Sequence, residues 1–137
     1  MFGLGGCNRA GRTKLPLLMV SVFFVSGCST TQEELVRGEL AETWQISAPM
    51  EDVFRRYKNY AGEHFSGGDF PFGGGYRATG HFYGSRAELS VKVDGTISAG
   101  TTYLHFELQE RSGGTQVRCW WYNRFWKKNV EKFRKLF

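Results

Sequence analysis

Histidine and cysteine are the residues of this 137-residue chain whose side chains most often bind metals or carry out catalysis. The three histidines are His64, His81 and His105, and no two of them stand at the spacing of a metal-ligand motif. The sequence also lacks Cys-x-x-Cys and His-Glu-x-x-His. We therefore expect neither a metal site nor a cofactor, and we interpret the histidines as residues of loops or of polar strand faces.

One acid/base arrangement is conceivable near the middle of the chain. Glu63, His64 and Asp69 share a glycine-rich segment, and a carboxylate beside a histidine can exchange protons with a substrate. Neighbouring polar residues are equally common in ordinary loops. The run Gly73–Gly75 in the same segment lacks the Lys-Ser/Thr that follows the glycines of a phosphate-binding loop.

A thiol nucleophile is the other conceivable catalytic group. Cys119 could be paired with His81 or His105 as its base. However, Cys119 alternates with Val117 and Trp121 on one face of an expected strand, which indicates a buried and unreactive thiol. We therefore predict that the protein is not an enzyme.

Binding of an apolar ligand is suggested by the glycine-rich segment 63–75, EHFSGGDFPFGGG. Its five glycines allow positive φ angles and close backbone approach. In one interpretation, Phe65, Phe70 and Phe72 form a lid over a pocket. In the other, the segment is a long connection whose aromatic side chains plug the end of the core. The sequence leaves both open.

Two surfaces could bind a partner. The C-terminal segment is strongly basic and includes Lys127 and Lys128, and it could contact anionic lipid head groups or an acidic partner; the alternative is the solvated face of an ordinary terminal helix. The second surface is the strand face with Arg118, Trp120 and Tyr122, because large aromatic residues and arginine are enriched at protein interfaces.

The elements before residue 29 indicate where the protein works. Arg9, Arg12 and Lys14 precede the apolar run Leu15–Val25, LPLLMVSVFFV. A membrane-spanning helix needs about 20 apolar residues, so this run is too short to span a bilayer stably. A positive segment followed by a short apolar run and small residues is typical of a secretory signal.

The run ends in Val25-Ser26-Gly27-Cys28, which resembles the lipobox of bacterial lipoproteins. The resemblance implies that residues 1–27 are removed as a signal peptide, and that Cys28 becomes the first residue and carries a diacylglyceryl group. Ser29, rather than Asp, implies release to the outer membrane, with the protein facing the periplasm. The membrane is therefore one expected partner, through the lipid on Cys28.

Composition limits the remaining functions. Three of the 18 basic residues precede Cys28 and all 13 acidic residues follow it, so the chain from Cys28 onward has a net charge of +2 rather than +5. Export together with this small charge argues against nucleic acid as a partner. With Cys7 removed and Cys28 acylated, Cys119 has no cysteine with which to form an intrachain disulfide. The remaining length suits one domain.

The pattern of apolar residues predicts an α+β domain. Residues 28–42 are expected to form the lipidated cysteine and a tether, with 33–42 either a short helix or part of the tether. Residues 43–137 are expected to form one domain: an antiparallel sheet of about five strands with an N-terminal and a C-terminal helix. The expected strands are 43–47, 76–83, 86–93, 101–110 and 115–122, and the expected helices are 49–61 and 124–137.

The entry Trp44–Phe54, WQISAPMEDVF, and the exit Val117–Phe137 together resemble a short version of the helix-grip, or START-like, fold. Such folds commonly wrap an apolar cavity between the sheet and the final helix, and truncated forms act as interaction modules in envelope lipoproteins. The predicted function is therefore a lipid-anchored envelope protein that binds another envelope component, either a protein or an anionic lipid. The alternative is a carrier that binds a lipid or another small apolar ligand in a helix-grip pocket.

Overall fold

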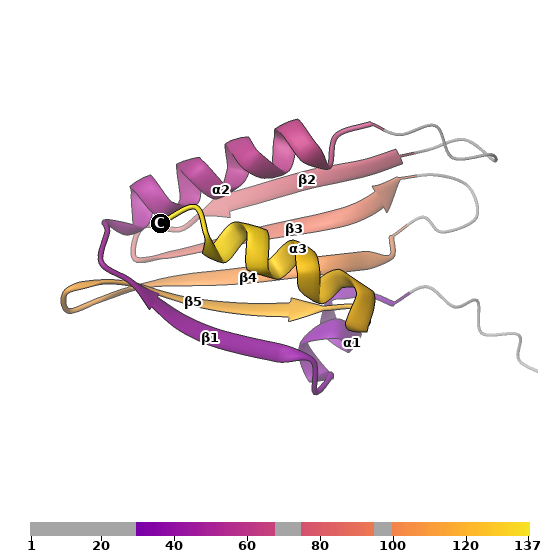
Figure 1. Ribbon diagram of the computed structural model, residues 1–137, viewed down its shortest axis with the longest axis horizontal. Helices are drawn as coiled ribbons and strands as arrows, with labels where there is room; N and C mark the ends of the chain where they lie inside the picture. The colour runs from indigo at the N-terminus through magenta and orange to yellow at the C-terminus, as the bar shows by residue number, and fades with distance from the viewer. Residues whose placement is uncertain (1–29, 68–74, 95–99) are drawn as a thin grey trace, which may run out of the picture.

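A five-stranded antiparallel sheet with the strand order β1-β5-β4-β3-β2 forms the centre of the molecule (Figure 1). The structure, a computed structural model, describes residues 30–67, 75–94 and 100–137. The first strand in the chain pairs with the last, so the outer strand β1 is joined to the rest through β5. The strands are β1 (Ala41–Ile46), β2 (Gly75–Phe82), β3 (Arg86–Asp94), β4 (Thr102–Arg111) and β5 (Gly114–Trp121).

The alternating residues of the central strands build one side of the core, as the sequence predicts. Along β4, Leu104, Phe106 and Leu108 are fully buried, and Val117 and Cys119 of β5 lie beside them. β-Branched, leucine and aromatic side chains at every second position give a sheet one continuous apolar face. The predicted α+β class and the five-stranded antiparallel sheet are confirmed.

Helix α2 (Met50–His64) covers this apolar face over β2–β4 (Figure 1). It buries Met50, Val53, Tyr57 and Ala61 at helical spacing. Pro49 stands at the N-cap, and two acids follow in the first turn, where the helix dipole favours them. The helix was expected to end before Gly62 but continues to His64, because a single exposed glycine lowers helix stability only by about 1 kcal/mol.

The C-terminal segment packs on the same face and closes the core. It was expected to be a single helix over 124–137, but it consists of a 3-10 turn η1 (Arg124–Trp126) followed by α3 (Lys127–Arg134). Asn123 caps the turn, because its Oδ1 accepts a hydrogen bond from the Phe125 backbone N–H at 3.0 Å. Val130 and Phe133 are the buried residues of α3.

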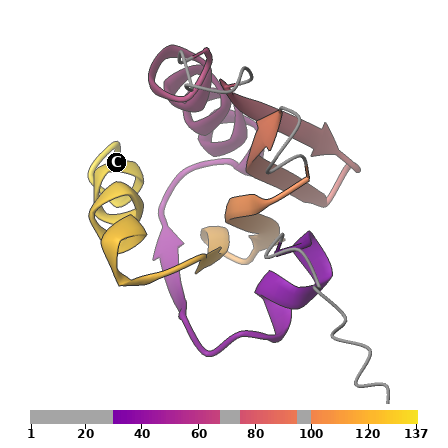
Figure 2. The ribbon, with the colours of Figure 1, turned by 90° about the vertical axis from the view of Figure 1, so that its right-hand side faces the viewer.

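A third helix, α1 (Gln32–Arg37), lies on the opposite face of the sheet from α2 and α3 (Figure 2). Thr31 and Glu34 form a capping box, and Leu35 is buried. The backbone carbonyl of Thr30 accepts a hydrogen bond from the Thr102 N–H at 2.8 Å, which joins the start of this segment to β4. Of the two alternatives for residues 33–42, the short helix agrees with α1, and the chain already lies against the sheet from Thr30 onward.

Candidate functional site

Beneath α1, three polar side chains form a closed ring of hydrogen bonds. Nδ1 of His105 lies 2.8 Å from Oγ of Ser90, Oγ of Ser90 lies 3.4 Å from Oε1 of Gln32, and Nε2 of Gln32 lies 3.5 Å from Nε2 of His105. All three contacts are satisfied together if His105 is neutral and carries its proton on Nδ1. Gln32 then donates to Nε2, His105 donates to Ser90, and Ser90 donates to Gln32.

Burial favours that neutral form of His105. The side chain has no solvent exposure, and removal from water lowers its pKa, while the nearby carboxylates of Glu107 and Glu88 act in the opposite direction. His105 lies on the polar face of its strand, as expected. It is nevertheless buried and not exposed to solvent. Since α1 covers this face, the imidazole is part of a second, smaller core.

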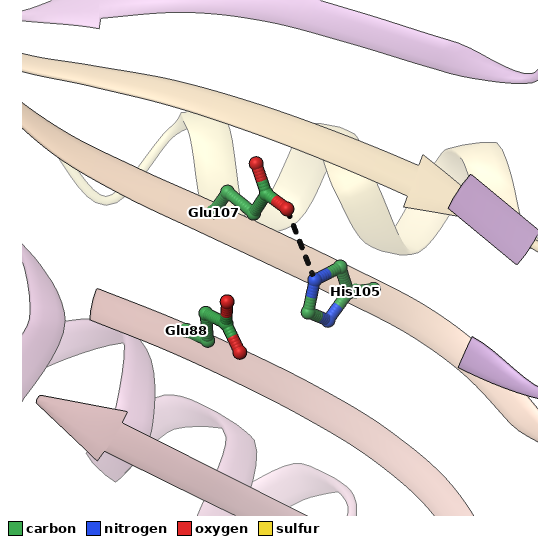
Figure 3. A group of neighbouring side chains, drawn as sticks. All are labelled: Glu88, His105 and Glu107. Atoms are coloured by element: carbon green, nitrogen blue, oxygen red, sulfur yellow. Dashed lines mark ion pairs between the residues drawn. The ribbon is translucent and has the colours of Figure 1, made fainter. Parts of the chain in front are cut away.

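Two carboxylates adjoin this ring and give the cluster the composition of a metal site (Figure 3). Single donor atoms of Glu88, His105 and Glu107 all lie within 4.8 Å of one another. However, Nη2 of Arg86 lies 2.6 Å from Oε1 of Glu88 and 3.3 Å from Oε1 of Glu107. The guanidinium already pairs with both carboxylates, so a cation would have to compete with it for their oxygens. We interpret the cluster as the polar attachment of α1 to the sheet.

Ser90, His105 and Glu107 also have the composition of a nucleophile–base–acid relay. Ser90 is 4% exposed, and its hydroxyl is held by Gln32 of the covering helix. Nε2 of His105 lies 3.8 Å from Oε1 of Glu107, beyond hydrogen-bond reach. In this arrangement α1 stands where a substrate would approach, so the three residues are best explained as structural.

The cysteine is placed as its strand position indicates. Cys119 is fully buried between Val117 and Trp121, and burial raises the pKa of its thiol well above the ordinary value. A thiol that stays protonated and away from solvent is a weak nucleophile. His64, which was considered together with Glu63 and Asp69, is exposed and stacks on Tyr60; Asp69 lies outside the described residues.

Phe65 lies inside the core rather than over an opening. Its ring is parallel to that of Phe133 at 6.0 Å between centroids and also contacts Tyr76 and Trp126. For this residue the structure agrees with the plug interpretation. Phe70 and Phe72, the other two members of the proposed lid, lie outside the described residues.

The space between α2, α3 and the sheet contains a cluster of aromatic rings. Tyr57 meets Phe106 and Phe133 edge to face, and Phe106 lies 4.6 Å from Phe133. A groove of about 580 Å³ opens at the surface between β1 and the end of α3, where Arg134 is part of its lining. In this groove an apolar ligand would lie open to solvent beside a charged wall, which does not favour the carrier alternative.

The prediction that Arg118, Trp120 and Tyr122 form an exposed contact surface is wrong for Trp120. Trp120 is only 2% exposed, because its ring lies in a row with Ser90 and His105 on the face that α1 covers. Arg118 is exposed and its guanidinium stacks over the Trp120 ring at 4.6 Å. Tyr122 is half-buried against Tyr103. These residues do not form one continuous aromatic contact surface.

The outer face of η1 and α3 is the basic surface expected from the sequence. However, Lys127 and Lys128 differ in their ion pairing. Nζ of Lys127 lies 3.5 Å from Oε1 of Glu42 on β1, and Arg134 reaches the same carboxylate. Lys128 is exposed and forms no ion pair with any acid in the described part of the chain. The same is true of three further exposed cations, so we define the basic face as Arg124, Lys128, Lys132 and Lys135.

Two features of the sequence indicate α1, although neither is part of the alternating apolar pattern. Thr31-x-x-Glu34 before an apolar residue is the signature of a capping box. In addition, Ser90, His105 and Trp120 form a cross-strand row without a carboxylate, lysine or arginine, next to the charged row of Glu88, Glu107 and Arg118. An uncharged row of this kind indicates that something covers it.

No protein-family model, curated protein or solved structure matches this chain. Among the described residues, no helix is long and apolar enough to span a membrane.

Proposed function

We propose that the protein is a lipid-anchored protein of the bacterial envelope, facing the periplasm from the outer membrane, and that its domain binds an anionic envelope component without catalysing a reaction. The proposed anchor is the diacylglyceryl group on Cys28. The proposal also takes the domain to be a short helix-grip domain. This assignment is supported by the order strand, helix, four strands, helix, with both long helices on one sheet face.

The observation that carries the binding proposal is the basic face. Arg124, Lys128, Lys132 and Lys135 stand four, four and three positions apart, so they lie along one side of the C-terminal helical segment. By contrast, Arg55, Arg86 and Lys127 are paired with acids. Four exposed cations with no acid partner in the part of the chain that the structure describes attract phosphates or carboxylates of a binding partner.

Charge reversal on the basic face tests the proposal. Crosslinking in intact cells should capture one dominant partner or lipid, and Lys128→Glu with Lys132→Glu should reduce that capture at least about tenfold, because each cation near an anionic surface contributes on the order of 1 kcal/mol. The control is Arg55→Glu with Lys58→Glu on α2, which makes the same charge change elsewhere. Equal capture by both double variants would overturn the role of the basic face.

A further inference from the structure

The folded part of the chain begins at one end of the domain, and two exposed apolar side chains lie at the same end. Thr30 is hydrogen-bonded to Thr102 at the beginning of β4, and Leu40 accepts a hydrogen bond from the Trp121 N–H at 3.2 Å at the end of β5. Phe125 follows β5 by four residues. Figure 2 looks at this end, where α1 and the start of the C-terminal segment are in view. We call it the tether end.

Phe125 and Leu40 are not part of the core. Phe125 is 71% exposed and Leu40 is 40% exposed, whereas Trp126, next to Phe125, packs against Phe65 and Tyr103. Three neighbouring rings at this end, those of Tyr76, Tyr103 and Trp126, lie within 5.7 Å of one another, centroid to centroid. Tyrosine and tryptophan are enriched where proteins meet the bilayer interface, and an exposed phenylalanine there buries its ring among lipids.

Thr30 follows Cys28 by only two residues in the sequence. Because the sheet holds the chain from Thr30 onward, only Ser29 separates the folded domain from a lipidated Cys28. Two residue steps span at most about 7 Å, so Thr30 must lie close to the lipid head groups. The tether end therefore cannot stand away from the bilayer once the lipid is inserted.

We infer that the tether end is a membrane-docking surface on which Phe125 and Leu40 insert into the bilayer interface while Arg124 and Lys128 contact lipid phosphates. The inference rests on the proposed function, because it needs the lipid on Cys28. Glu33 and Glu39 are exposed on the α1 side of the same end. The charges of this end are therefore mixed, and the apolar contacts supply the main attraction.

Docking would fix the direction of the domain. β3 has nine residues and runs from the hairpin at Tyr83 to the tether end, so Tyr83 lies about 30 Å from the membrane-facing surface. The end with Tyr83 would then point into the periplasm. Tyr83 is itself an exposed aromatic residue, which makes it a matched control for Phe125.

The experiment uses the lipidated full-length product, purified from membranes and reconstituted in vesicles of phosphatidylethanolamine and phosphatidylglycerol. An environment-sensitive dye is attached to Phe125→Cys, Leu40→Cys or Tyr83→Cys, and Cys119 remains unlabelled because it is buried. The expected result is strong quenching by lipids that carry a shallow quencher at positions 125 and 40, and none at 83. Both docking positions are exposed, so the dye leaves the core unchanged.

Failure of the inference differs from failure of the proposed function. If the intact mass shows a lipid on Cys28 but the dye is quenched equally at positions 125 and 83, the docking surface is wrong and the anchor stands. If the mass shows no lipid on Cys28, the proposed anchor is wrong and the docking inference falls with it. Quenching that persists at high salt supports insertion of the apolar side chains over attraction by charge.

Discussion

Nδ1 of His105 lies 2.8 Å from Oγ of Ser90, and both side chains are buried beneath α1. The pair belongs to the ring that includes Gln32, so the first helix of the chain is joined to the middle of the sheet by a polar contact. The ring requires a neutral imidazole. When His105 is protonated, Nε2 presents a second N–H toward the Gln32 amide, and the charged ring must also remain buried.

Stability should therefore fall in mild acid. Burial lowers the pKa of folded His105 below its ordinary value near 6.5, so the unfolded chain binds more protons than the folded one below that pH. The contribution of His105 to the free energy of unfolding is complete above about pH 6.5 and is lost as the pH falls through the unfolded value toward the folded one. Urea unfolding between about pH 8 and about pH 5.5 measures this slope.

The matched variants for this prediction are His105→Gln and His81→Gln. His105→Gln should lower stability at neutral pH by about 1–3 kcal/mol and flatten the acid slope, because it breaks a buried hydrogen-bond ring. His81 is exposed, so its substitution should leave both the stability and the slope unchanged. A slope that is the same in all three proteins would contradict the role of His105.

Docking of α1 also depends on one apolar contact. Leu35 is buried on the second face of the sheet, so Leu35→Ala should cost about 2 kcal/mol of unfolding free energy or more and expose residues 30–40 to proteolysis. Arg37→Ala in the same helix is the control, because its side chain is exposed. If Leu35→Ala is as stable and as protease-resistant as Arg37→Ala, docking of α1 through Leu35 is wrong, and the segment before β1 behaves as a tether, the other alternative for residues 33–42.

α1 and α2 differ in how well the sequence predicts them. Met50, Val53, Tyr57 and Ala61 recur at helical spacing, so α2 could be predicted together with its buried face. α1 has only six residues and one buried side chain, which is too short for a periodic signal. Its position depends on contacts with Ser90 and His105, residues far along the chain, and a local pattern cannot specify such contacts.

The candidate site residues show the same limit: a local pattern predicts the strand face of a residue but not what covers that face. Cys119 was correctly expected to be buried, because alternation along one strand determines its face. Trp120 was expected to be available to a partner, because the same alternation assigns it to the other face and carries no information about what covers that face. Likewise, only the folded structure shows that Glu42 pairs with Lys127 and not with Lys128.

The turn between β4 and β5 offers a test of the strand pairing. Gly113 and Gly114 both have positive φ angles, +85° and +147°. A Cβ at Gly114 would overlap the Ile46 carbonyl oxygen on β1, whereas a Cβ at Gly113 meets no other atom nearby. Gly113→Ala should cost about 1–2 kcal/mol from backbone strain alone, and Gly114→Ala should cost clearly more. Thermal or urea unfolding measures both. Equal losses would show that β1 does not pass beside this turn.

Cys119 gives a chemical measure of core opening. Because the thiol is buried and its pKa is raised, alkylation in native conditions should proceed only through unfolding, and should become rapid in denaturant. Peptide mass spectrometry locates the adduct at residue 119. Leu35→Ala should speed native alkylation about tenfold for each 1.4 kcal/mol of unfolding free energy that it removes, because the unfolding equilibrium constant depends exponentially on that energy. Rapid labelling of the native protein would contradict the packing of β5.

The most direct test of the central claim, that this is a lipid-anchored envelope protein, is the mass of the N-terminal peptide of the protein extracted from membranes. The prediction is a chain that begins at Cys28 and carries a diacylglyceryl group, together with palmitate labelling that Cys28→Ala abolishes. A mature chain that begins at another residue, or an unmodified Cys28, would contradict the account.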